Sequence, residues 1–375
     1  MKKRVLIFYI SRNSGHYYAA SAIEKGLFAV GNNLQVEKIN ALDYTNPILG
    51  RVLNKTYLEV IKKKPEMWGN IYDNPEVLEK TKKARENIFK YNMSRMKKLI
   101  EYHDPHIILC TQAFPCGMAA CYKKKYAAKI SLIGVLTDYA PHSYWLFDEV
   151  DYYVVPSEDA GNVLVAKGVP IEKTKVYGIP VDPKFCLQHD KALIKKKFKL
   201  EETEPIVLVM GGSQGLGQME GIVDTLLAQK NRGYQVLVVT GTNKKLYRRL
   251  KKQRGQKGIY VLPYTEYIDQ LMEIADVIVT KAGGLTVAET LVKGLPMIIV
   301  NPIPGHERMN ADYLIAKGAA VEVKHYSNIC QRLEDLFSSR EKLEQMKNNI
   351  GKLANPESAL NIARLALASF EKYNS

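Results

Sequence analysis

Short apolar segments separated by helical stretches recur along the whole chain, and this alternation limits the possible folds more than any other feature. These segments form two series along the chain, and the second consists of IVLVM, QVLVV, IYVLPY, VIVT and PMIIV. Strands that alternate with helices predict right-handed βαβ units and a parallel sheet in each half of the chain. The segments of the first series are Arg4–Ile10, His106–Cys110, Ile130–Thr137 and Tyr152–Pro156.

The length of 375 residues is large for one core, so two domains are expected. The stretch VYGIPVDPKF, with two prolines and a glycine, precedes a charged segment that marks the linker. Two doubly wound α/β domains that face each other would place a cleft at the carboxyl ends of their strands. We predict an N-terminal domain over residues 1–185, a linker over 186–203, a C-terminal domain over 204–355 and a final helix over 356–375 that packs on the N-terminal domain.

The composition excludes several classes of protein. No apolar run reaches the roughly 18–20 residues of a membrane-spanning helix. The run Val5–Ile10 is too short for the apolar region of a signal peptide. The five cysteines are scattered and lack C-x-x-C spacing, which argues against a disulfide framework or a zinc site and favours a reducing cytosol.

The net charge indicates an anionic partner. The chain has 54 basic and 39 acidic residues, a net charge of +15. Residues 48–100 hold 13 basic and 6 acidic side chains, so about half of the excess is concentrated there. Nucleic acid, an acidic membrane surface or a phosphorylated substrate would each fit such an excess.

Two glycine-containing turns between a strand and a helix are candidate phosphate sites. The first, after VLVM, contains Gly212, Ser213 and Gln214, and the second contains Gly283 and Gly284. Glycines let backbone N–H groups approach an anion, and the helix that follows offers its positive N-terminus. The turns lack the G-x-x-x-x-G-K-[ST] pattern, so a nucleoside triphosphatase is not indicated. Taken alone, tight turns without a ligand explain these glycines equally well.

Polar residues follow the second glycine turn. We expect a helix that begins near Thr286, with Glu289 in its first turn, where a carboxylate is electrostatically favourable. The same carboxylate could accept bonds from two adjacent hydroxyls of a ribose. Further on, NPIPGHERMNA supplies His306, Glu307 and Asn310, whose donors and acceptors suit sugar hydroxyls.

The N-terminal half has its own candidate catalytic groups. Gly15 and His16 follow the first strand directly, and LTDYAPHSYW places Asp138, His142 and Trp145 after another strand. A histidine and an aspartate at neighbouring strand ends can share general-base work, one accepting the proton and one orienting it. A single histidine is more often structural, so the residues alone leave this open.

The order of these motifs resembles that of a known family. Strand–Gly-His–helix is followed by TDYAPHSYW, MGGSQG, PYTEYIDQLMEIADVIVTKAGGLTVAE and PIPGHERMNA. The lipid-modifying glycosyltransferases, which include plant monogalactosyldiacylglycerol synthases and bacterial processive diacylglycerol glucosyltransferases, share this order. The glycosyltransferase that adds N-acetylglucosamine to the peptidoglycan lipid precursor is more distantly similar. The resemblance covers nearly the whole chain and is most specific over Pro263–Ala311.

The resemblance implies a GT-B fold that binds a UDP-sugar in the C-terminal domain. Glu289 would bind the ribose hydroxyls, and the inverting reaction would need neither metal nor cofactor, because helix dipoles and backbone N–H groups stabilise the departing UDP. The family commonly has Pro-Gly-Gln-Glu where this chain has His306, which leaves the donor sugar open. The implied donor-site residues are Gly15, Gly212, Ser213, Gln214, Tyr267 and Ile268 beside the uracil, Gly283, Gly284, Leu285, Thr286, Glu289, Gly305, His306, Glu307 and Asn310.

The acceptor side rests on composition and on the resemblance. Lys62, Lys63, Lys64 and Trp68 lie among aliphatic and aromatic residues, a mixture typical of an interfacial segment on an anionic membrane. In the family, this region admits diacylglycerol. Together with Trp145, these residues are the predicted membrane and acceptor contacts, although an exposed charged hairpin would have the same composition.

We therefore predict a peripheral enzyme on the cytoplasmic face of the cell membrane. It would transfer glucose, or less readily galactose, from UDP to the 3-hydroxyl of diacylglycerol and form a β-glycolipid. His16 would be the general base, with Asp138 and His142 positioning the acceptor. Alternatives are N-acetylglucosamine transfer to a polyprenyl-linked precursor, a soluble UDP-sugar epimerase, and a nucleic-acid binder. No recognised nucleic-acid motif accompanies the charge, so nucleic acid is not an expected partner.

Overall fold

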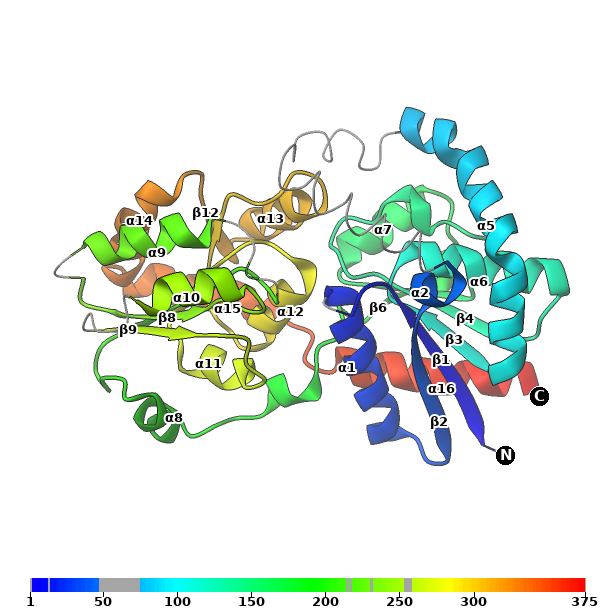
Figure 1. The fold of residues 1–375 in the computed structure, drawn as a ribbon, viewed down its shortest axis with the longest axis horizontal. Coiled ribbons are helices and arrows are strands. Elements are labelled where there is room, and N and C mark those ends of the chain that lie inside the picture. Colours follow the sequence, from blue (N-terminus) through cyan, green and yellow to red (C-terminus); the bar gives the residue numbers. More distant parts are fainter. Residues whose placement is uncertain are drawn as a thin grey trace. The chain divides into compact units, whose positions relative to one another are not determined.

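The computed structural model describes residues 2–12, 14–46, 75–213, 215, 218–229, 232–252 and 258–374. The chain divides into two compact units (Figure 1). The first contains residues 1–183, 304–306 and 355–375, and the second contains residues 184–303 and 307–354. Each unit is a parallel sheet with helices packed on it, so the predicted pair of doubly wound α/β domains is confirmed.

The sheet of the first unit is buried on both faces. Its six strands are all parallel and lie in the order β2-β1-β3-β4-β5-β6. On β1, Val5 and Ile7 belong to one core cluster, whereas Leu6 and Phe8 belong to the other. The strands are β1 (Lys3–Tyr9), β2 (Leu34–Asn40), β3 (Ile107–Cys110), β4 (Ser131–Val135), β5 (Tyr152–Val155) and β6 (Thr174–Val176).

Two pairs of helices supply most of the apolar cover of this sheet. Helices α1 (Gly15–Val30) and α16 (Ser358–Asn374) pack on one face, and α5 (Pro75–His103) and α6 (Ala113–Tyr126) pack on the other. Helices α1 and α16 approach so closely that a Cβ atom on Gly26 would lie 2.5 Å from the carbonyl oxygen of Ala359. The shorter helices are α2 (Ala41–Thr45), α7 (Glu158–Ala166), η1 (Ser143–Trp145) and η2 (Ile171–Lys173).

The second unit repeats this architecture with the strand order β12-β11-β10-β7-β8-β9. Its strands are β7 (Ile206–Met210), β8 (Gln235–Val239), β9 (Ile259–Leu262), β10 (Val277–Thr280), β11 (Met297–Val300) and β12 (Ala320–Val323). Its helices are α8 (Lys191–Phe198), α9 (Met219–Ala228), α10 (Lys244–Lys251), α11 (Ile268–Ile274), α12 (Gly284–Val292), α13 (His306–Ala316), α14 (Ile329–Phe337) and α15 (Arg340–Leu353), with the short turns η3 (Pro183–Cys186) and η4 (Tyr326–Asn328).

The stretch 186–203, expected to be a linker, contains a helix. Asp190 caps α8 by accepting hydrogen bonds from the Ala192 and Leu193 N–H groups. The stretch belongs to the second unit, where the buried Asp269 on α11 lies 3.0 Å from His189 Nε2 and 3.3 Å from Lys184 Nζ. Its many lysines hide this helix in the sequence. Among the described helices, none has the length and apolar character required to cross a bilayer.

Candidate active site

His16 lies where β1 passes into α1, and the protein fixes the orientation of its ring. Nδ1 lies 2.8 Å from the carbonyl oxygen of Thr111, just after β3, and 3.2 Å from Thr137 Oγ1, just after β4. A carbonyl oxygen only accepts hydrogen bonds, so Nδ1 carries the proton and Nε2 keeps its lone pair. The ends of three neighbouring strands therefore hold an imidazole that can accept a proton at Nε2.

The surroundings of His16 favour the neutral ring. Burial lowers the pKa of the His16 imidazole below its ordinary value of 6.5, because desolvation penalises the charged form. The negative charge of Asp138 acts in the opposite direction and raises this pKa, as does the bond to Thr111. Asp138 is thus placed to stabilise the positive charge that forms when His16 accepts a proton.

His142 and Trp145 follow Asp138 on the segment after β4, but their side chains lie in more apolar surroundings than His16. The His142 ring lies 5.5 Å from that of Tyr144 and 6.2 Å from that of Trp145, so it is packed among aromatic side chains. Trp145, expected to contact the membrane or acceptor, is only 4% exposed and belongs to the apolar core. The prediction for Trp145 is therefore wrong: its indole packs beside Gly134 on β4.

The glycine turn after β7 has a backbone conformation and a close packing that require glycine. Gly212 and Gly215 have φ angles of +70° and +57°, which side-chain-bearing residues rarely adopt. A Cβ atom on Gly215 would lie 2.1 Å from the carbonyl oxygen of Thr240, so the turn packs tightly on the segment after β8. The Ser213 carbonyl accepts a hydrogen bond of 2.9 Å from the Thr242 N–H. Gln214 lies outside the described residues.

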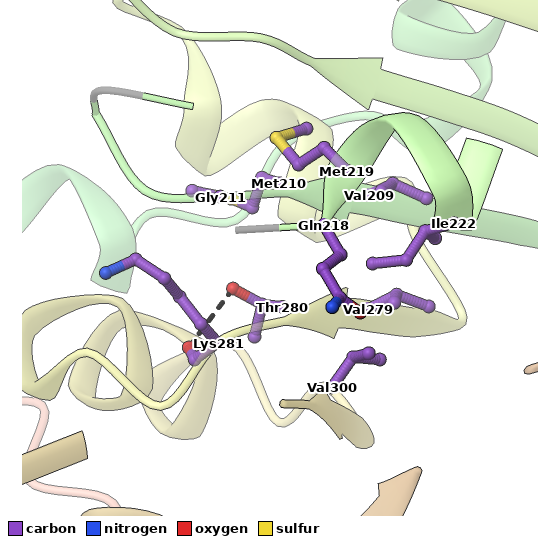
Figure 2. Close-up of a pocket in the computed structure, with 10 residues that line it drawn as sticks. All are labelled: Val209, Met210, Gly211, Gln218, Met219, Ile222, Val279, Thr280, Lys281 and Val300. Atoms are coloured by element: carbon purple, nitrogen blue, oxygen red, sulfur yellow. Dashed lines mark hydrogen bonds between the residues drawn. The ribbon is translucent and has the colours of Figure 1, made fainter. Parts of the chain in front are cut away.

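A small pocket opens beside this turn (Figure 2). Its walls come from the ends of β7, β10 and β11 and from the start of α9, and most of its lining is apolar. The Lys281 side chain extends away from these apolar residues (Figure 2). The lining residues are Val209, Met210, Gly211, Gln218, Met219, Ile222, Val279, Thr280, Lys281 and Val300.

The second glycine turn starts α12 earlier than predicted. Gly283 is the N-cap residue and Gly284 the first helical residue, so Leu285 and Thr286 already belong to the first turn. The expectation that Glu289 lies in that turn is wrong: it falls in the second turn, and the first contains no acidic residue. The difference arises because Gly283 accepts the first helical hydrogen bond, from the Val287 N–H at 3.0 Å. The Glu289 side chain is half-buried.

Lys281, which no sequence motif predicted, connects the two glycine turns to the start of α13. Its ammonium forms an ion pair with Glu307, whose other carboxylate oxygen accepts a 3.2 Å bond from the Ile303 N–H. Its Cε atom would lie 3.6 Å from a Cβ atom on Gly212. In the sequence, only its position between an apolar strand and two glycines indicates a special role for Lys281.

The residues that were predicted to face the donor sugar lie at the start of α13, and two of them make buried structural contacts. Gly305 has a φ of +93° and leads into α13, which begins at the half-buried His306. Glu307 is 2% exposed, and the fully buried Asn310 donates a 3.0 Å hydrogen bond to the Ala282 carbonyl. Glu307 and Asn310 therefore hold the turn around Ala282 against α13.

The predicted uracil contacts lie at the start of α11. Tyr267 is the N-cap residue of this helix and Ile268 its first residue, and both are half-buried. The Tyr267 ring packs against Phe198, at a centroid distance of 5.7 Å, and Lys197 Nζ lies 4.6 Å from its centre. Helix α8 thus covers part of the Tyr267 ring. The predicted membrane residues Lys62, Lys63, Lys64 and Trp68 lie outside the described residues.

Two Rossmann-like units with glycine turns at their strand ends define the GT-B class of glycosyltransferase fold. MurG from Acinetobacter baumannii has this fold, with a TM-score of 0.64 and 15% identity over 98% of this chain and 99% of that chain. A UDP-GlcNAc 2-epimerase from Neisseria meningitidis, bound to UDP-GlcNAc, gives a TM-score of 0.63 and 16% identity, covering 98% and 100% of the two chains. At such identities the likeness concerns the fold alone.

Sequence comparison identifies the family. Residues 16–181 match the monogalactosyldiacylglycerol (MGDG) synthase family, and residues 206–362 match the glycosyltransferase family 28 C-terminal domain. A processive diacylglycerol beta-glucosyltransferase from Bacillus subtilis is 30% identical over 352 residues, which cover 93% of this chain and 90% of that protein. The chain therefore belongs to the glycosyltransferase family that includes the MGDG synthases and the processive diacylglycerol beta-glucosyltransferases, and the resemblance seen in its motifs is confirmed.

Proposed function

We propose that this protein transfers a hexose from UDP to the 3-hydroxyl of diacylglycerol, with inversion, to form a β-glycolipid. Glucose is favoured over galactose as the sugar. The observation that carries the proposal is the 30% identity, over 93% of the chain, to a relative named as a diacylglycerol beta-glucosyltransferase. The fold does not distinguish the alternatives, because a glycosyltransferase and an epimerase share it.

In the proposed reaction, the second unit binds the donor. The diphosphate is held by backbone N–H groups of the turn at Gly212 and by the N-terminus of α12 at Gly284, both of which suit an anion. Glu289 accepts bonds from the ribose hydroxyls. These dipoles also stabilise the departing UDP, so no metal or cofactor is required by the proposal.

The first unit activates the acceptor. Nε2 of His16 accepts the proton of the 3-hydroxyl as the oxygen attacks the anomeric carbon and the bond to UDP breaks. Asp138 stabilises the resulting imidazolium, an assignment supported by its effect on the pKa of His16. His142 positions the acceptor.

The acceptor is a membrane lipid, so we propose peripheral binding to the anionic cytoplasmic face of the membrane. Helix α5 supports this: Tyr91 and Tyr102 are 73% and 84% exposed. Arg95 and Lys98 lie between them at spacings of three or four residues, so the four side chains share one face of the helix. Tyrosines beside basic residues are typical of an interfacial surface.

The proposal is tested by incubating the protein with diacylglycerol in detergent micelles and each of UDP-glucose, UDP-galactose and UDP-N-acetylglucosamine, with and without EDTA. We expect a β-linked hexosyl-diacylglycerol from UDP-glucose, with a rate that EDTA does not change. The anomeric configuration follows from the proton coupling of the product. Consumption of UDP-N-acetylglucosamine without a lipid acceptor would favour an epimerase instead.

Glu289→Ala should weaken UDP binding by at least roughly 10- to 100-fold, since each hydrogen bond to the lost carboxylate is worth about 1.5–3 kcal/mol. Calorimetric titration with UDP measures this. Glu341→Ala, which removes an exposed carboxylate at the first turn of α15, is the matched control and should bind UDP as the parent does. Parental UDP affinity in a folded Glu289→Ala variant would remove this residue from the donor site.

A further inference from the structure

A second concentration of positive charge lies in the donor-binding unit. Residues 244–257 contain eight basic and no acidic side chains, whereas residues 48–100 have a local net charge of +7. Together these two stretches carry a charge equal to the whole net charge of +15. The charge of residues 48–100 suits the acceptor side of the enzyme, but the donor contacts proposed above include none of the residues 244–257.

Helix α10 (Lys244–Lys251) gives this charge a defined surface. Leu246 and Leu250 are buried and attach the helix to its own unit. Arg249 adds an ion pair to Glu220 and another, of 2.8 Å, to Asp224 on α9. Because the apolar side of α10 is already covered, this helix does not insert into an apolar environment.

The outward side of α10 is uniformly basic. Lys245, Arg248 and Lys252 are exposed, and their spacing of three and four residues places them on one face. The ring of Tyr247 is half-buried, and Lys251 Nζ lies 5.6 Å from its centre. We call the face formed by Lys245, Arg248 and Lys252 the α10 basic face.

We propose that the α10 basic face binds the anionic headgroups of a lipid bilayer, as a membrane contact of the second unit. Exposed ammonium and guanidinium groups complement lipid phosphates, and each basic residue near such a surface adds roughly 1 kcal/mol to binding. The half-buried Tyr247 offers little ring for base stacking, which disfavours single-stranded nucleic acid. The choice of a lipid surface rests on the diacylglycerol acceptor proposed above.

The test variant is Lys245→Gln/Arg248→Gln/Lys252→Gln, which leaves Arg249 and the buried leucines in place. Its matched control is Lys342→Gln/Lys347→Gln/Lys352→Gln, which removes three exposed positive charges from α15, a helix that also carries glutamates. Co-sedimentation with vesicles of equal parts phosphatidylcholine and phosphatidylglycerol measures membrane affinity. Vesicles of phosphatidylcholine alone report the contribution that does not depend on charge.

We expect the α10 variant to bind the anionic vesicles roughly a hundredfold more weakly than the parent, and the α15 variant to change far less. The difference between parent and α10 variant should shrink in about 1 M salt, where the Debye length is near 3 Å. Both variants should keep parental UDP affinity and parental hexose transfer in detergent micelles.

Equal vesicle binding by the α10 variant and the parent would overturn the proposal, as would equal losses in the α10 and α15 variants. So would an α10 variant that keeps its vesicle affinity and loses affinity only for an oligonucleotide. Failure of the proposed function has a different signature, because the parent would then transfer no hexose to diacylglycerol even in micelles.

Discussion

A His16→Ala variant should fold, bind UDP as the parent does, and transfer sugar at least ~10²-fold more slowly. A diacylglycerol hydroxyl is a poor nucleophile, so a base must accept its proton as the glycosidic bond forms. The Thr111 carbonyl holds the proton of His16 on Nδ1, which leaves Nε2 as the acceptor. Turnover at saturating donor and acceptor measures the effect, and UDP calorimetry confirms that the donor unit is intact.

The dependence of turnover on pH gives an independent test of the same role. Burial places the pKa of His16 below 6.5, so the ring is neutral above that value and turnover should not vary with pH there. As the pH falls below 6.5 towards the lowered pKa, protonation removes the Nε2 lone pair and turnover should decrease. The unfolded chain, with its ordinary pKa, binds this proton first, so the stability of the first unit should decrease in the same direction.

His142→Ala is the comparison variant, since the proposed role of His142 is to position the acceptor. We expect a smaller decrease in turnover, with a higher KM for diacylglycerol and an unchanged acidic limb of the pH profile. Near-parental turnover in His16→Ala, together with an inactive Asp138→Ala variant, would show that the general base has been assigned to the wrong strand end.

Apart from β9, which lies at an edge, the strands that the sequence predicted are those inside each sheet. β1, β3, β4 and β5 have long apolar runs because helices cover them on both faces. The three strands that the pattern missed, β2, β6 and β12, all lie at a sheet edge. Every residue of β2 is at least partly exposed, so its apolar residues alternate with Gln35, Glu37 and Lys38 and form no continuous run.

The candidate site was predictable where backbone conformation demands a residue type. Gly212 has a left-handed φ, and motif order located His16 and Glu289. The direction of a side chain was harder to predict from the sequence. Trp145 stands in a polar loop sequence, yet its indole enters the core beside Gly134. Ion pairs between residues distant in the sequence could not be predicted. The partner of Lys281, for example, lies 26 residues further along the chain.

Lys281→Met should destabilise the second unit by about 3–5 kcal/mol, since it leaves the carboxylate of Glu307 buried without its counter-ion. Glu307→Gln should cost less, because the Lys281 side chain is 18% exposed and its flexible stem can move towards water. The double variant Lys281→Met/Glu307→Gln removes both charges and should recover most of the loss. Urea unfolding of the four proteins measures these differences.

UDP affinity in the same four proteins separates two roles for Lys281. An uncompensated Glu307 carboxylate would lie beside Gly283, where the proposed diphosphate site begins, and its charge would repel UDP. If Lys281 acts only as the counter-ion of Glu307, UDP binding weakens in Lys281→Met and returns in the double variant. If Lys281 binds the diphosphate directly, affinity stays low in both. We expect recovery, because the ammonium is bound to Glu307. Equal stability and UDP affinity in all four proteins would show that the ion pair contributes to neither.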